Sequence, residues 1–86
     1  MLIPIRMQAF FNDRNLSIVK DRIEGRAMTS IAKDHSISPE RVRQIVAKYK
    51  RICSRPAILK DAGFAPDESI GDDQYLQMID YHRRNR

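Results

Sequence analysis

The sequence has little of several residue types, and each shortage excludes a class of chemistry. Among its 86 residues Cys53 is the one cysteine, so the chain can form no intrachain disulfide and no cysteine-based zinc site. Its three glycines make no glycine-rich phosphate loop. No nucleophile elbow or catalytic carboxylate pair is evident either. We therefore expect no enzymatic activity, no cofactor and no metal, and a composition suited to a reducing cytoplasm.

Long apolar runs are also missing. Apolar residues gather at the N-terminus, but Pro4 and Arg6 interrupt them, and the stretch is too short to span a membrane or to act as a signal peptide. We expect this stretch to pack on the core of the protein through Leu2, Ile3, Ile5, Met7, Phe10 and Phe11.

What the chain does have is positive charge, and this charge is unevenly distributed. Sixteen lysines and arginines against eleven acidic residues give a net charge of +5, which favours a polyanionic partner. Residues 39–55 carry six cations against Glu40 alone, whereas residues 61–73 carry five acids and no cation. Separated signs would turn the basic face toward DNA and the acidic stretch away from it; the alternative is that both runs are merely solvated faces.

The basic run coincides with a helix-turn-helix pattern over residues 27–51. Apolar residues recur with helical spacing on both sides of a short break, at Met28, Ile31, Ala32 and His35 and then at Val42, Ile45, Val46 and Tyr49. The break, residues 36–38, is long enough only for a turn. Ile37 would fill the space between the helices, Ser38 would cap the second helix, and Pro39 suits its first position. In such motifs the second helix, here 39–51, lies in the DNA major groove.

The same residues resemble a known family. The segment Ile31-Ala32-Lys33, then Ile37-Ser38, then Glu40-Arg41-Val42-Arg43-Gln44-Ile45 with Ala47-Lys48, is similar to region four of bacterial housekeeping sigma factors, which recognises the upstream promoter hexamer. The resemblance covers about residues 14–52. The chain is too short for the regions that melt promoter DNA, so the resemblance implies a small transcription regulator of a phage or mobile element.

The resemblance also implies roles for individual residues. It places Glu40 and Gln44 in base-reading positions, while Pro39 stands where the family usually has a base-contacting arginine. Gln44 would bond to an adenine and Glu40 would accept a hydrogen bond from a cytosine amine. Other polar residues of the motif would mostly hold phosphates and fix the register, namely Thr29, Ser30, Ser38, Arg41, Arg43, Lys48, Lys50 and Arg51. The alternative for Arg41 and Arg43 is a role in helix packing.

The sequence pattern outside the motif predicts further helices and no β-strand. Asn12 or Asp13 would cap a helix that runs to about Glu24 and ends at Gly25. A short helix would begin at Pro56 and end at Gly63, residues 65–69 would form a loop, and a last helix would begin at Asp72 or Asp73. We therefore expect one all-α domain over residues 1–86, with four to five helices, a helix-turn-helix at 27–51 and a helical extension at 53–86.

Several single residues carry two interpretations. We expect Cys53 to be a core thiol, His35 to pack on the first helix of the motif, and His82 to lie in a mobile tail. The basic end, residues 81–86, either complements the helix dipole or touches phosphates. The last helix offers Leu76 and Ile79, which would form either a homodimer surface or part of the monomer core.

Three functions remain open at this point. The first is a sequence-specific regulator that binds double-stranded DNA in the cytoplasm of a bacterium or phage-infected cell. The second is a protein-interaction module that binds RNA polymerase or a sigma factor, which the acidic stretch and Pro39 favour. The third is an adaptor in DNA packaging or recombination, since helix-turn-helix domains also serve there.

Overall fold

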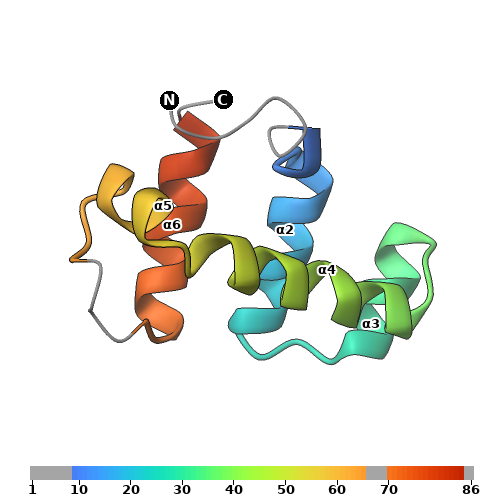
Figure 1. The fold of residues 1–86 in the computed structure, drawn as a ribbon. Helices are drawn as coiled ribbons and strands as arrows, with labels where there is room; N and C mark the ends of the chain where they lie inside the picture. Colours follow the sequence, from blue (N-terminus) through green and yellow to red (C-terminus); the bar gives the residue numbers. More distant parts are fainter. Residues whose placement is uncertain (1–8, 66–69, 85–86) are drawn as a thin grey trace.

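The computed structural model describes residues 9–65 and 70–84, and five α-helices lie wholly within these ranges. No β-strand occurs in these ranges, so the predicted small all-α fold is confirmed. The N-terminal residues 1–8 and most of the expected loop, 66–69, lie outside the described residues. The helices are α2 (Asp13–Ile23), α3 (Met28–His35), α4 (Pro39–Cys53), α5 (Pro56–Asp61) and α6 (Asp72–Arg84) (Figure 1).

The helix starts follow from side-chain caps and prolines. Asn12, rather than Asp13, caps α2, because its Oδ1 accepts a hydrogen bond from the Asn15 backbone N–H at 2.8 Å. Ser38 caps α4 as predicted, with its Oγ accepting from the Arg41 N–H at 3.1 Å. Pro39 opens α4, where a missing N–H costs nothing.

Three helices end in the same way, with a residue in the left-handed conformation. Gly25 follows α2 with φ 102°, Gly63 follows α5 with φ 94°, and Ser36 follows α3 with φ 56°. In each case the next N–H reaches a carbonyl five residues back; that of Ile37 bonds to the Ala32 oxygen at 3.0 Å. Ser36 is the one residue with a side chain in this role among the described residues. The turn 36–38 is therefore a tight helix end followed at once by a helix cap.

A single hydrophobic core joins the helices, and α4 runs through the middle of them (Figure 1). The long helix packs on α2 and α3 along one part of its length and on α5 and α6 along another. The predicted inward residues of the motif are buried, except that Met28, His35, Ile37 and Val46 are only partly covered. Fully buried aliphatic and aromatic side chains include Phe11, Leu16, Ile18, Val19, Ile31, Val42, Ile45, Tyr49, Met78 and Ile79.

Cys53 is buried at the C-terminal end of α4, which confirms the predicted core thiol. Burial in apolar surroundings raises the pKa of this thiol to about 12. The thiol is therefore protonated and unreactive at neutral pH.

The expectation for His82 was wrong. This residue is 1% exposed, its ring stacks on Phe11 with centroids 4.5 Å apart, and its Nδ1 lies 3.1 Å from the Tyr49 hydroxyl. The basic neighbours suggested a solvated tail, but the helical period of α6, from Tyr75 through Met78, continues to position 82. His82 is a core residue that joins α6 to α4.

The last helix is held to the domain by further polar contacts. The Tyr81 hydroxyl donates to Asp61 at 2.7 Å, and Arg83 donates to the Ser17 hydroxyl at 3.0 Å. Ile79 is fully buried and Leu76 is partly buried, so the monomer core takes up much of the expected dimer surface. Dimerisation through α6 stays a prediction. Within the described residues, no helix has the length and apolar character needed to cross a membrane.

Candidate nucleic-acid interface

One side of α4 is lined by exposed residues, and none of the other described helices packs on it. Glu40, Gln44, Ala47 and Arg51 recur every three to four residues, so they form a single row, which we call the outer row. All four are exposed, and the buried row of α4 lies on the opposite side of the helix. Both predicted base-reading residues thus lie in the outer row.

Cations flank the outer row on both sides. Arg41 and Lys48 are seven residues apart and lie on one flank, while Arg43 and Lys50 have the same spacing on the other. The sequence predicted all four as phosphate-binding residues. The structure places them as two parallel pairs, one on each side of the row that contains Gln44.

Glu40 is already engaged by a neighbour. Arg43 donates from Nε to Glu40 Oε2 at 3.0 Å, and its Nη2 pairs with the second carboxylate oxygen. The arginine lowers the pKa of Glu40, with a smaller contribution from Gln44, and the carboxylate raises the pKa of Arg43. Because both side chains are exposed, solvent screens this pair and it contributes little to stability, so it can open when either side chain binds another group.

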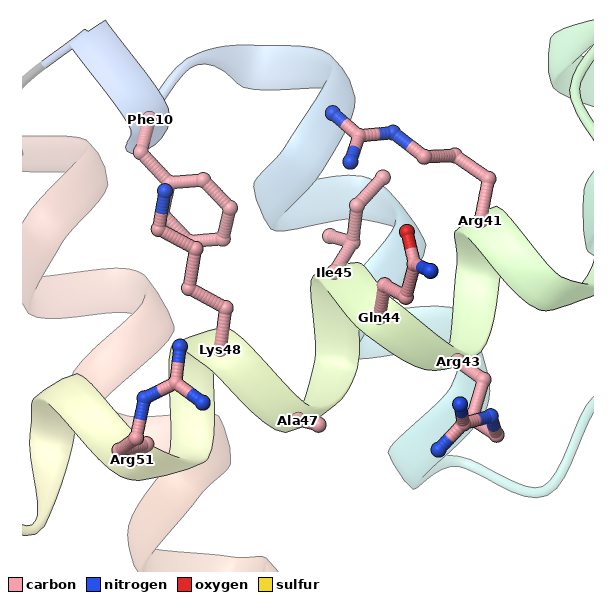
Figure 2. A pocket seen from close by; sticks show the side chains of 8 residues that line it. All are labelled: Phe10, Arg41, Arg43, Gln44, Ile45, Ala47, Lys48 and Arg51. Carbon is pink, nitrogen blue, oxygen red and sulfur yellow. The ribbon is translucent and has the colours of Figure 1, made fainter.

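A hollow of about 340 Å³, which we call the Phe10 groove, lies along the Arg41 flank of α4. Lys48 reaches over the ring of Phe10, with its Nζ 4.8 Å from the ring centroid. Figure 2 shows Lys48 directed toward Phe10, with Arg41 and Gln44 on the same side of α4 and Arg43 at the opposite edge. The residues that line the Phe10 groove are Phe10, Arg41, Arg43, Gln44, Ile45, Ala47, Lys48 and Arg51.

A second hollow of about 310 Å³, the Met28 groove, lies along the other flank. Three apolar side chains, Met28, Val46 and Ala47, line it together with three cations, Arg22, Arg43 and Lys50. Lys50 is partly buried, and its Nζ lies 5.4 Å from the centroid of the Tyr75 ring. Ala47 and Arg43 line both grooves, so the outer row forms the ridge between them.

The start of α3 provides further donors on the Met28 side. Ala27 occupies the cap position of α3, and no side chain there accepts a hydrogen bond from the first turn. Thr29 and Ser30 are exposed in this turn, as expected for phosphate-binding residues. Ser38, predicted for the same role, uses its hydroxyl oxygen to cap α4 but is exposed and retains its proton as a donor.

Arg26 fixes the position of α3 relative to α2. Its guanidinium pairs with Asp21 at 2.9 Å and with Asp34 at 2.5 Å, which joins the end of α2 to the last turn of α3. Arg22 donates to the Arg26 carbonyl at 3.0 Å. These contacts tie the loop between α2 and α3 to both helices.

Sequence reasoning missed three residues of the two grooves. Phe10 and Met28 were assigned to the core, and Arg22 received no role because it precedes the motif. No local pattern distinguishes them, since they approach α4 only through the packing of the chain. Most of the other lining residues, in contrast, belong to the motif that the sequence singled out, although their division into an outer row and two flanks comes from the structure.

Comparison of the chain with protein-family models, curated proteins and solved structures gave no match. The functional argument therefore depends on the geometry of α4 and its surroundings.

Proposed function

We propose that this protein is a sequence-specific regulator that binds double-stranded DNA through a helix-turn-helix formed by α3, the turn 36–38 and α4. The observation that carries the proposal is the exposed outer row of α4, flanked on each side by a pair of cations. Gln44 and Ala47 at the centre of this row would face base edges, and the cations would face phosphates.

The dimensions support insertion of α4 into the major groove. An α-helix with its side chains is about 10–12 Å across, and the B-DNA major groove is about 12 Å wide. The two phosphate backbones border this groove, so each cationic flank of α4 would meet a different strand. Arg41 and Lys48 would bind phosphates of one strand. Arg43 and Lys50, together with the first turn of α3 at Thr29 and Ser30, would bind those of the other.

The pairing of Glu40 with Arg43 refines the roles within the row. A carboxylate in the major groove needs either a cytosine amine or a cation nearby, because phosphates repel it. Arg43 supplies that cation and reduces the repulsion between the Glu40 carboxylate and the phosphates. Gln44 and Arg51 are then the two polar members of the row that can contact bases without first losing an ion pair.

The wider setting is part of the proposal. The similarity of the segment around α4 to region four of sigma factors favours a role in transcription, in a small regulator of a phage or mobile element. A buried thiol and the absence of any second cysteine favour a reducing cytoplasm.

A selection from randomised duplexes over a series of salt concentrations tests the proposal. Recovery of a short common sequence, with affinity that falls steeply with salt, is the expected result. Retention without sequence preference would contradict it. That outcome would favour the protein-interaction module, and capture of RNA polymerase or a sigma factor from solution would then be the relevant measurement.

The salt dependence also tests the flanks. Lys48→Gln removes one proposed phosphate contact and should reduce the slope of log affinity against log salt by about 0.9. Lys60→Gln is the matched control, because Lys60 is exposed on α5, away from both grooves. Equal slopes for the two variants would exclude Lys48 as a phosphate contact.

A further inference from the structure

We infer that Ala47, with the apolar side of the Met28 groove, recognises the 5-methyl group of a thymine. This inference rests on the proposed function and names part of the sequence that the protein selects. Ala47 is the apolar member of the outer row, in which the other three members are Glu40, Gln44 and Arg51. A methyl side chain at the centre of a DNA-facing row has no hydrogen bond to offer, but it fits against another methyl group.

The surroundings of Ala47 favour this ligand. Ala47 lines the Met28 groove together with Met28 and Val46, which are both partly buried. The thymine methyl group would therefore leave water on entering this groove. Arg22, Arg43 and Lys50 line the same groove. An apolar surface among cations matches the edge of a duplex, where a thymine methyl lies between phosphates, and double-stranded RNA offers neither that methyl nor an open major groove.

Helix geometry predicts where the thymine lies. Ala47 is three residues beyond Gln44, which corresponds to about 4.5 Å along the helix axis. Successive base pairs are about 3.4 Å apart. The thymine should therefore lie within about two base pairs of the position at which Gln44→Ala removes sequence preference.

Deoxyuridine substitution tests the inference, because it removes the methyl group and leaves the hydrogen-bonding groups unchanged. Each thymine of the selected site is replaced in turn, and binding is measured for the full-length protein. One replacement within the predicted distance should weaken binding about fourfold, the equivalent of about 0.8 kcal/mol for one buried methyl group. The variant Ala47→Gly should bind the thymine duplex and the deoxyuridine duplex equally.

The matched control is Ala57→Gly, which makes the same change at an exposed alanine of α5 and should retain the fourfold difference. Circular dichroism checks that both variants keep their helices, and Ala47→Ser, a better helix former than glycine, should also lose most of the difference. A site with no thymine in the predicted interval, or a difference that persists in Ala47→Gly, would overturn the inference alone. Failure to select any common sequence would overturn the proposed function, and the inference with it.

Discussion

At the scale of single residues, substitution of Gln44 should affect sequence preference and leave the general affinity for DNA nearly unchanged. Gln44→Ala should lose about 1–3 kcal/mol of preference for the selected site while binding to unrelated DNA stays nearly the same, because a base contact contributes only where the right base is present. Titrations with the selected and a scrambled duplex measure both quantities. Gln77→Ala, at an exposed position on α6, is the control. Equal losses on the two duplexes would remove Gln44 from the base-reading residues.

His82 should make the stability of the fold sensitive to acid. Burial lowers the pKa of His82 from 6.5 to about 4, so between these values only the unfolded chain takes up the proton. This contribution is fully present above pH 6.5 and is lost as the pH falls toward 4, by on the order of 3 kcal/mol.

Urea unfolding at pH 7.5 and pH 4.5 measures this effect. His82→Phe should lose less stability between the two pH values than the natural chain, whereas Tyr49→Phe, which keeps the histidine, should retain the larger loss. An identical pH dependence in His82→Phe and the natural chain would show that other groups cause it.

The roles of many single residues could be predicted from the sequence where their cause is local. The Ser38 cap depends on a serine before a proline, and the burial of Cys53 depends on helical spacing. The pairing of Glu40 with Arg43 needs only two opposite charges three residues apart, yet the resemblance drew attention to base contacts instead. His82 was misjudged because its charged neighbours outweighed the spacing of α6.

At the scale of elements, the turn between α3 and α4 contains avoidable strain. Ser36 adopts φ 56°, a conformation that costs a residue with a side chain about 1 kcal/mol relative to glycine. Ser36→Gly should therefore raise the free energy of unfolding by up to about 1 kcal/mol, measured in urea.

Ser54→Gly provides the contrast for this turn. Ser54 ends α4 with φ −82°, and its hydroxyl donates to the Lys50 carbonyl at 2.7 Å, so glycine should destabilise the protein there. A loss of stability in both variants would mean that the Ser36 hydroxyl outweighs the backbone strain.

The bounds of the elements followed closely from the sequence. Asn12, Ser38 and Pro56 mark helix starts through caps and a fixed φ, and Gly25 and Gly63 mark ends, because these effects act within one turn of helix. The second helix of the motif extends from the predicted Arg51 to Cys53, since Ile52 and Cys53 continue its buried row.

At the scale of the whole molecule, α6 completes the core that α4 requires. Tyr75, Met78, Ile79 and His82 are all buried, and burial of a large apolar side chain such as Met78 or Ile79 contributes about 1.5–3 kcal/mol. A small domain is stable by only about 5–15 kcal/mol in total.

A chain that ends at Ile70 should therefore show no cooperative thermal transition by circular dichroism, although it retains the whole proposed helix-turn-helix. A transition matching that of the full chain would instead show that the first four described helices form an independent core.

The arrangement of helices was the part that the sequence left open. Local rules identify α2 to α6 but do not say that Phe10 and Arg22 reach α4 from different sides, because those contacts depend on how the helices pack. Both grooves beside the outer row are products of that packing. Three acidic residues of the described ranges, Asp61, Asp72 and Asp73, belong to α5 and the start of α6, near the end of α4 that lies far from α3 (Figure 1).

The position of Lys50 over the ring of Tyr75 has a spectroscopic consequence. The chain contains no tryptophan, so its ultraviolet emission comes from three tyrosines alone. Tyr49 is sealed in the core, whereas the ammonium group of Lys50 lies 5.4 Å from the Tyr75 ring centroid and belongs to a flank that would meet phosphate. When that group moves, the electric field at the ring changes. We therefore expect tyrosine emission to change when α4 binds DNA as proposed, with Tyr75 as the responding ring.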